Sequence, residues 1–214
     1  ITFGEAAIVH IGSAEIGKMK KEGFTVKELL EIQSKFDTGA EFIDLSSKLP
    51  KKLRKDNMAG VLVIRDGLNK IFNRKKAADK FLNEQKEISY DKKYYCTRTK
   101  KTKNKQARYN IVFGDENIQA SEDYKTFTIK SFNDLKYLRK LRKKLGKVLG
   151  VKAKKLNAEG NFYYSDKSGI GFHGDAERKI VVCLSLGDPT TLRYCWRESG
   201  NSQLYGKPID IEIN

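Results

Sequence analysis

A change of hydrophobic period along the chain constrains the fold more than any other feature. Leucines recur every three or four residues across Ser131–Val151, which is the spacing of one apolar face on an α-helix. The later segments Lys179–Leu186, Leu192–Arg197 and Ile209–Ile213 are short, rich in β-branched or aromatic residues and separated by turn signals, as strands are. Helices therefore precede strands instead of alternating with them, which predicts an α+β fold. Short strands at this spacing favour either a sandwich or a jelly roll, that is, a double-stranded β-helix.

The N-terminal half is expected to be helical and basic. Thr25–Phe36 carries apolar residues at helical spacing behind a Thr25 N-cap, and Lys75–Glu87 also has a helical pattern. Between them, Gly60–Arg65 is a short apolar run that predicts a buried strand. A length of 214 residues suits one domain with an extension. We expect the extension, of unknown role, at residues 1–88 and the domain at residues 89–214.

The charge of the chain predicts a polyanionic partner. Lys and Arg number 43 and Asp and Glu number 27, for a net charge of +16. Such a balance favours nucleic acid as the partner, followed by an anionic membrane surface. Eight basic residues and no acid lie in Lys92–Arg108, next to several tyrosines, and ten basic residues and no acid lie in Lys136–Lys155. The first run could also be a disordered loop, and the second a solvated helix surface.

Several protein classes are excluded. No apolar run approaches the roughly 20 residues of a transmembrane helix. Three cysteines are too few for a disulfide scaffold, and two histidines without a Cys-x-x-Cys pair do not suit most zinc-finger spacings. There is no signal-peptide pattern, so we expect a reducing intracellular compartment, either nucleus or cytoplasm.

A possible metal site lies in the segment from Asn161 onward. His173 and Asp175 are two residues apart, so on a strand both side chains share one face and could chelate a divalent metal. Taken alone, this pair is a weak signal. Asn161 and Tyr163 are also two apart, and their amide and phenol are neutral donors suited to a carboxylate.

The order of motifs around this pair resembles the AlkB family of Fe(II)- and 2-oxoglutarate-dependent dioxygenases. The motifs are Asn161-x-Tyr163, then His173-x-Asp175 with Glu177, and a strand ending in Ser185-Leu186-Gly187. Upstream, Lys105-Gln106-Ala107-Arg108-Tyr109 followed by Gly114-Asp115 resembles a further element of the family, with four residues inserted. The resemblance covers about Tyr94–Ile213, and the first ninety residues match no family known to us.

The resemblance implies a set of roles. His173 and Asp175 would be the catalytic iron ligands, and Asn161 and Tyr163 would hydrogen-bond 2-oxoglutarate. Substrate contacts would come from Glu177, Gln106, Arg108 and Tyr109. The cofactors would be Fe(II), 2-oxoglutarate as cosubstrate and O₂. The implied activity is oxidation of a nucleic-acid base in DNA or RNA, either by removal of an N-methyl group, as in DNA repair, or by hydroxylation of the base.

The chain departs from the family in one respect. No histidine follows Asp175, although the family has a distal iron-binding His, and arginines that pair with 2-oxoglutarate, beyond the Ser-Leu-Gly strand. We expect the dioxygenase domain to be incomplete at its C-terminal end. There are three other interpretations. A partner chain could complete the site, the protein could be a degenerate relative without turnover, or His10 could be the third ligand.

Two other functions fit the same residues. A protein or peptide hydroxylase would use the same iron site and turn over a peptide. A non-catalytic relative would bind nucleic acid without needing iron or 2-oxoglutarate. The sequence does not distinguish DNA from RNA, identify the modified base or give the oligomeric state.

Overall fold

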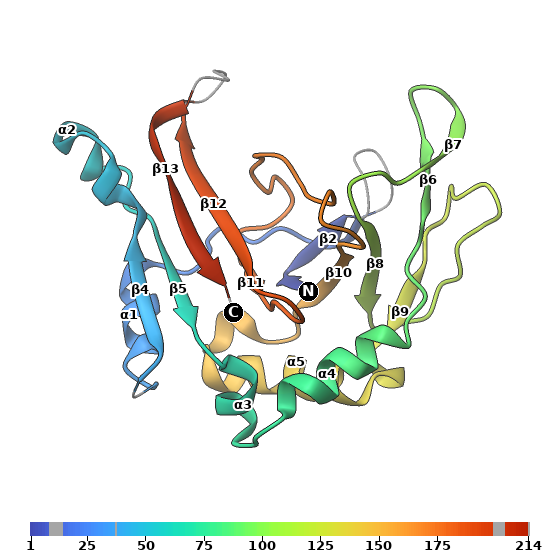
Figure 1. The fold of residues 1–214 in the computed structure, drawn as a ribbon, viewed down its shortest axis with the longest axis horizontal. Coiled ribbons are helices and arrows are strands. Elements are labelled where there is room, and N and C mark those ends of the chain that lie inside the picture. The colour runs from blue at the N-terminus through green and yellow to red at the C-terminus, as the bar shows by residue number, and fades with distance from the viewer. Residues whose placement is uncertain (9–14, 37, 199–203, 214) are drawn as a thin grey trace. The chain divides into compact units, whose positions relative to one another are not determined.

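The computed structural model describes residues 1–8, 15–36, 38–198 and 204–213. The chain forms two compact units, each built from two separate stretches of sequence (Figure 1). Unit 1 holds Ile1–Gly23 and Asp79–Leu184, and unit 2 holds Phe24–Ala78 and Ser185–Asn214. The fold is α+β, as expected from the sequence, but the expected order of helices before strands is wrong, because strands also occur throughout the N-terminal half. Over the described ranges, none of the helices is long and apolar enough to cross a bilayer.

A five-stranded sheet organises unit 1, with the strand order β11-β1-β10-β8-β9. Its strands are β1 (Thr2–Gly4), β8 (Tyr109–Gly114), β9 (Ile129–Ser131), β10 (Asn157–Phe162) and β11 (Val182–Cys183). Neighbouring strands are antiparallel except for the parallel pair β8 and β9. Two hairpins accompany the sheet, β2 (Ala6–Ile8) with β3 (Glu15–Gly17), and β6 (Lys93–Cys96) with β7 (Lys101–Asn104).

The strand register gives this sheet a polar face and a helix-covered face. Asn110 pairs with Asn161, and Glu159 pairs with both Val112 and Thr2, so alternate residues of β8, β10 and β1 point the same way. The polar face carries Asn110, Val112, Glu159, Asn161 and Cys183. The helix-covered face carries Phe3, Ile111, Phe113, Ala158 and Gly160.

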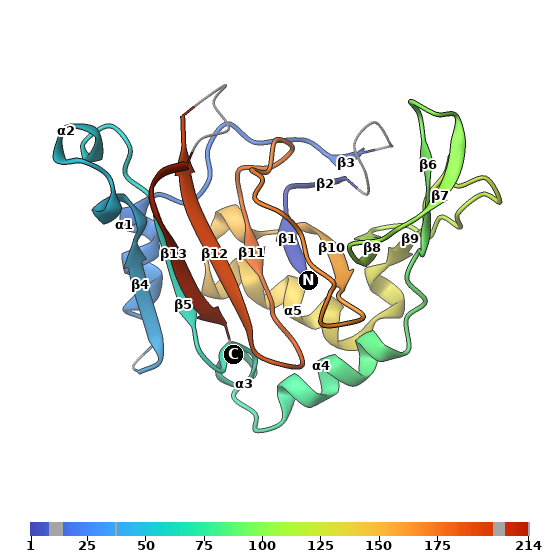
Figure 2. The ribbon, with the colours of Figure 1, turned by 45° about the horizontal axis from the view of Figure 1, so that its top comes forward.

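Helix α5 (Lys136–Val148) and a preceding 3-10 turn, η2 (Phe132–Asp134), pack on the helix-covered face. The Phe132 ring lies 6.5 Å from the Phe3 ring and 6.2 Å from the Phe113 ring, measured between centroids. The backbone N–H groups of Tyr137 and Leu138 donate to the Glu84 carboxylate of α4 (Ala77–Lys86), which caps the start of α5. Figure 2 shows α5 behind β1 and β10, with the segment between β10 and β11 in front.

A small apolar cluster covers one end of the polar face. Val112 and Ile129 of the sheet pack there against Ala7 and Phe127, with Ile16 beside them. The other end of the polar face, around Glu159 and Asn161, carries hydrogen-bonding and charged groups instead. This is where the segment between β10 and β11 brings the predicted site residues.

Among its described residues, unit 2 has two antiparallel strand pairs and three short helices. The elements are α1 (Val26–Gln33), β4 (Ala40–Asp44), the 3-10 turn η1 (Leu45–Lys48), α2 (Lys51–Arg54), β5 (Gly60–Ile64), α3 (Gly67–Phe72), β12 (Thr190–Arg197) and β13 (Leu204–Ile213). Strand β4 pairs with β5, and β12 pairs with β13, both antiparallel. Leu45, Val63 and Ile211 form the centre of the core, and the Trp196 indole N–H donates to the Leu45 carbonyl at 2.9 Å.

Most predicted elements are present with shifted ends. Thr25 forms a capping box with Glu28 at the start of α1, as its N-cap position predicts. The helix predicted from Ser131 begins only at Lys136, because Ser131 ends β9 and its hydroxyl accepts from Asn133 N–H to cap η2. The strand predicted over Lys179–Leu186 is limited to Val182–Cys183. The described strands form one five-stranded sheet and four two-stranded sheets, none of which closes on itself.

Candidate active site

Arg178 is the centre of the polar end of unit 1. It is 5% exposed, and its guanidinium contacts three carboxylates. Nε lies 3.1 Å from Asp175 Oδ2 and 2.9 Å from Glu177 Oε1, and Nη2 lies 3.3 Å from Glu159 Oε2. Burial lowers the pKa of Arg178, but the three carboxylates outweigh burial, and the net pKa lies above its ordinary value. Arg178 therefore stays charged and fixes the positions of all three acids.

His173 and Asp175 face each other. Nε2 of His173 lies 3.7 Å from Oδ1 of Asp175, and Nδ1 of His173 lies 2.8 Å from the Gly171 carbonyl. A carbonyl can only accept, so Nδ1 carries the proton, and the lone pair of the neutral ring is on Nε2. Metal-binding histidines commonly donate their second ring N–H in this way, because the bond fixes the tautomer and the orientation of the ring.

The separation of these two atoms is compatible with a shared metal ion. Ligand atoms about 2.1 Å from a metal, at right angles to each other, are about 3.0 Å apart. A small side-chain adjustment brings Nε2 and Oδ1 from 3.7 Å to that separation, since the His173 side chain is half exposed. No group of three His, Cys, Asp or Glu side chains that could hold a metal is found in the part of the chain that the structure describes. The predicted alternative ligand His10 lies outside those residues.

Glu5 anchors the backbone that follows Arg178. Its buried carboxylate accepts from the backbone N–H groups of Lys179 at 2.7 Å, Ile180 at 2.9 Å and Lys20 at 3.0 Å. Burial raises the pKa of Glu5, but these hydrogen bonds outweigh burial, so the net pKa is lowered and the carboxylate stays ionised. The same bonds explain why β11 is short, because the amides of Lys179 and Ile180 donate to a side chain and not to a neighbouring strand.

Asn161 belongs to the same network through Arg108. The Arg108 Nε donates to Asn161 Oδ1 at 2.5 Å, and its Nη2 lies 3.6 Å from Glu159 Oε1. The buried Asn110 amide also donates to Glu159 Oε1, at 3.0 Å. Partial burial raises the pKa of the Tyr163 phenol, with the Arg108 charge acting in the opposite direction. The Tyr163 hydroxyl therefore keeps its proton and can donate to an acceptor.

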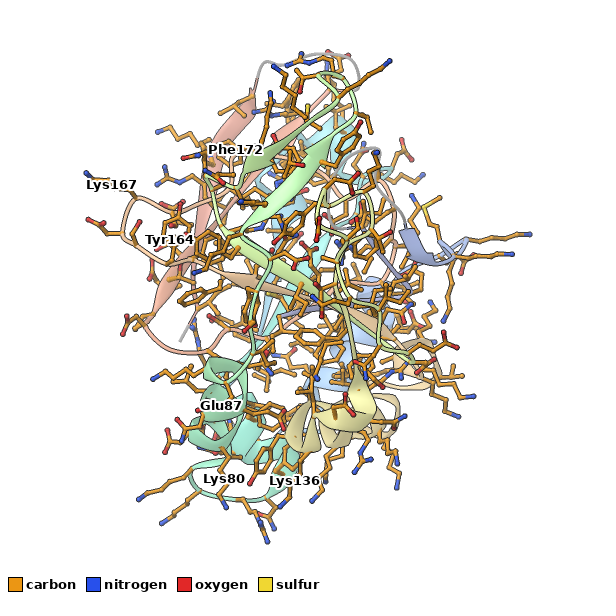
Figure 3. The ribbon with its side chains drawn as sticks, turned by 90° about the vertical axis from the view of Figure 1, so that its right-hand side faces the viewer. Lys80, Glu87, Lys136, Tyr164, Lys167 and Phe172 are labelled. Carbon is orange, nitrogen blue, oxygen red and sulfur yellow. The ribbon has the colours of Figure 1, made fainter. Side chains whose placement is uncertain are left out.

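Gln106 and Tyr109 are joined through Tyr164, outside the hydrogen-bond network of Arg178 and Arg108. The Tyr164 hydroxyl donates to the Gln106 carbonyl at 2.7 Å, and the Gly169 N–H donates to the Ala107 carbonyl at 3.1 Å. The rings of Tyr109 and Tyr164 stack with centroids 4.3 Å apart and planes 19° apart. By register, Tyr109 pairs with Phe162 and so belongs to the face opposite Asn161. Figure 3 labels Tyr164, Lys167 and Phe172, which lie on the same side of the view.

The basic run at Lys92–Arg108 contains an antiparallel hairpin over Lys93–Asn104, in place of the irregular loop that was one of its readings. All four residues of β7 are exposed. The Lys92 ammonium lies 5.5 Å from the centre of the Tyr109 ring, which links the hairpin to the tyrosine stack. A row of exposed cations therefore leads up to an aromatic surface beside Gln106.

The structure brings most of the predicted residues into one network. Arg178 connects Asp175 and Glu177 to Glu159, and Arg108 connects Glu159 to Asn161. His173 joins this network through Asp175, and the Glu177 carboxylate points toward Arg178. Glu159, Asn110 and Arg178 belong to this network but are not among the residues predicted from the sequence. Glu159 could have been found, because it precedes Asn161 by two residues on the same strand face. Nothing in the local sequence identifies Arg178, because its partner Glu159 is 19 residues away.

Comparisons with known proteins find one relative of the whole chain. The chain is 35% identical over 219 aligned residues to the uncharacterized protein R156 of Acanthamoeba polyphaga mimivirus, and the alignment covers 100% of the chain and 83% of that protein. No protein-family model and no solved structure matches the chain.

Proposed function

This chain belongs to the same family as the uncharacterized mimivirus protein, and we propose that it is an AlkB-like, Fe(II)- and 2-oxoglutarate-dependent dioxygenase that oxidises a nucleic-acid base. The observation that carries the proposal is the orientation of His173 and Asp175. The Gly171 carbonyl and the Arg178 guanidinium each bind the outer atom of one side chain and leave Nε2 and Oδ1 facing each other. This is the arrangement that a two-residue chelate requires.

The donor groups near Asn161 suit the proposed cosubstrate. His173 Nε2 and Asp175 Oδ1 would hold the ferrous ion. A residue other than these two would supply a further ligand. The Asn161 amide, the Tyr163 hydroxyl and the Arg108 guanidinium are donors that would bind a dicarboxylate. When bound, Fe(II) with 2-oxoglutarate and O₂ supplies oxidation of an otherwise unreactive C–H bond. If that bond belongs to an N-methyl group, the product releases formaldehyde and leaves the base demethylated.

The surface beside the chelate supports a nucleic-acid substrate. The exposed lysines of β7 provide contacts for phosphates, and the stacked Tyr109 and Tyr164 rings provide an aromatic face for a base. A base must leave its stack before an enzyme can modify its atoms, and aromatic rings compensate for the lost stacking. The Gln106 carbonyl accepts from the Tyr164 hydroxyl at the edge of this stack, and Gln106 and Glu177 would contact the extruded base.

The proposal extends to the fold. In a jelly roll two sheets pack together, so each sheet has an inner face and an outer face. The five-stranded sheet of unit 1 has this division between its polar face and its helix-covered face. We therefore propose that this sheet is one half of a double-stranded β-helix.

The test is metal and cosubstrate binding by the full-length protein. Anaerobic Fe(II) and 2-oxoglutarate should produce the visible charge-transfer band of a ferrous keto-acid complex. That band should disappear in His173→Ala and persist in Lys167→Ala, an exposed control in the same segment. In air, succinate should be released with N-methylated oligonucleotides. Release with peptides alone would favour the peptide hydroxylase, and nucleic-acid binding without band or succinate would favour the non-catalytic binder.

A further inference from the structure

Helix α5 presents a surface of cations on the side opposite its buried leucines. Leu138, Leu141 and Leu145 are each no more than 2% exposed and point into unit 1. At about 100° per residue, the basic residues cluster on the other side of the helix. We name this surface the α5 basic face, and it comprises Lys136, Arg139, Lys140, Lys143, Lys144 and Lys147.

The acids near this face are already engaged. Glu84 accepts the N–H groups at the start of α5, and Asp134 pairs with Lys130 at 3.2 Å. Asp115 pairs with Arg142, which also donates to the Leu156 carbonyl at 2.6 Å and lies over the Phe132 ring. Arg142 is therefore a structural residue, and the α5 sequence contains no acid that could pair with Lys140, Lys143 or Lys147.

A pocket adjoins the α5 basic face. Its volume is about 320 Å³, and its lining includes Arg139, Lys143 and Lys155, with the Asn133 amide at its rim and the Arg142–Asp115 pair at its side. Across the described residues, Arg139, Lys143 and Lys155 form no ion pair with a carboxylate. A pocket of this size and charge accommodates a phosphate group together with part of its sugar.

This surface lies on the opposite side of the sheet from the candidate active site. Phe132, directly before α5, packs on Phe3 and Phe113, whereas Glu159 and Asn161 belong to the polar face. In Figure 2 α5 lies behind the sheet, and in Figure 3 Lys136 lies at the opposite end of the view from Phe172. The α5 basic face is therefore a second surface, on the other side of the sheet from Glu159 and Asn161.

We infer that the α5 basic face and its pocket hold the phosphodiester backbone of a nucleic acid, apart from the candidate active site. The cations repeat along a helix about 18 Å long, which suits a polymer with evenly spaced charges. The exposed residues of α5 are Lys136, Lys140, Lys143 and Lys147, so the helix itself offers no apolar side chain for insertion into a lipid surface. This inference concerns binding alone and does not depend on the oxidation chemistry.

The test compares two triple substitutions that remove the same charge. Lys140→Gln, Lys143→Gln and Lys147→Gln change the α5 basic face. Lys51→Gln, Lys52→Gln and Lys55→Gln change three exposed lysines at and after α2 in unit 2. Binding of a fluorescent single strand of about 40 nucleotides would be measured by anisotropy over a salt series, without metal. Unfolding midpoints would confirm that both variants are folded.

The α5 variant should bind at least tenfold more weakly, and its log–log salt slope should fall by about 2, because three phosphate contacts are lost. The α2 variant should bind like the unchanged protein. Equal losses in both variants, or no loss in the α5 variant, would overturn the inference. So would an α5 variant that loses affinity only for anionic vesicles or for an acidic protein. The charge-transfer band of the ferrous keto-acid complex tests the proposed oxidation separately. If that band is absent while nucleic-acid binding still depends on α5, the proposed oxidation fails and this inference stands.

Discussion

The Arg178 guanidinium lies 3.1 Å from Asp175 Oδ2, and so the other oxygen of that carboxylate faces His173. The contact joins residues only three apart, but the buried position of Arg178 depends on Glu159, from a different strand. A carboxylate free to rotate would have to lose that rotation on binding a metal. The contact with the Arg178 guanidinium has already removed this rotation. In the same way, side chains that bind metal ligands from outside increase the affinity for the metal.

Replacing this guanidinium should weaken iron binding. Arg178→Lys keeps the charge but loses the planar fork that binds Asp175, Glu177 and Glu159 together. We expect the affinity for Fe(II), measured by anaerobic titration, to fall by about 10- to 100-fold. Arg178→Gln should also lower the free energy of unfolding by about 3–5 kcal/mol, because it leaves buried carboxylates without their partner. Lys179→Gln, an exposed neighbour, is the control, and an equal effect there would contradict the positioning role of Arg178.

Replacing Arg108 should affect the cosubstrate more than the metal. Its side chain binds both Asn161 and Glu159, so Arg108→Gln should leave the Asn161 amide without a fixed orientation. The KM for 2-oxoglutarate should rise about tenfold, with a smaller change in kcat, in steady-state succinate assays. The Fe(II) affinity should stay within a factor of about two, since Arg108 has no contact with His173 or Asp175 among the described pairs. A loss of iron binding equal to that of Arg178→Lys would argue against separate roles.

Neutralising the β6–β7 hairpin should weaken substrate binding at the candidate site. Lys101→Gln with Lys103→Gln removes two exposed charges from β7. For single-stranded oligonucleotides, the salt slope should fall by about 1.4, and the KM for the oligonucleotide should rise while the iron band stays unchanged. Lys51→Gln with Lys52→Gln removes the same charge from α2 and should have no effect. An unchanged salt slope in the β7 variant would exclude the hairpin from the interface.

The stability of the protein should rise with pH above about 8. Burial lowers the pKa of Lys105 from 10.5 to about 8, with the charges of Asp91 and Glu159 acting in the opposite direction. The unfolded chain binds the extra proton between these two values, so the free energy of unfolding increases with pH in that range. Lys105→Met should abolish this increase.

Urea denaturation of the unchanged protein and of Lys105→Met at pH 7.5 and 9.5 measures this difference. The stability advantage of the variant should shrink at the higher pH. Both values lie below pH 10, where Tyr90, whose pKa burial raises to about 12, would begin to oppose the trend. Equal changes in the free energy of unfolding of the two proteins between the two pH values would show that the pKa of Lys105 is not lowered.

Local features of this chain could be predicted without coordinates. The Thr25 capping box forms between residues three apart, and the α5 leucines share a face because of helix geometry. The two-residue spacing of His173 and Asp175 likewise anticipated their proximity, although they lie in an irregular segment and not on a strand. In each case the interaction joins neighbours along the chain, so the spacing of residue types contains the information.

The long-range contacts could not be predicted in this way. Glu5 holds the amides of Lys179 and Ile180 across more than 170 residues, and Glu159 meets Arg178 only because β10 lies within the central sheet. The division between a polar face and a helix-covered face depends on the register of β8 against β10. Spacing along a chain carries no information about partners so far apart, because packing of the whole unit selects them. The sequence thus determines which types of residue are available for chemistry. The packing of the folded unit determines which of them are in contact and how each side chain is oriented.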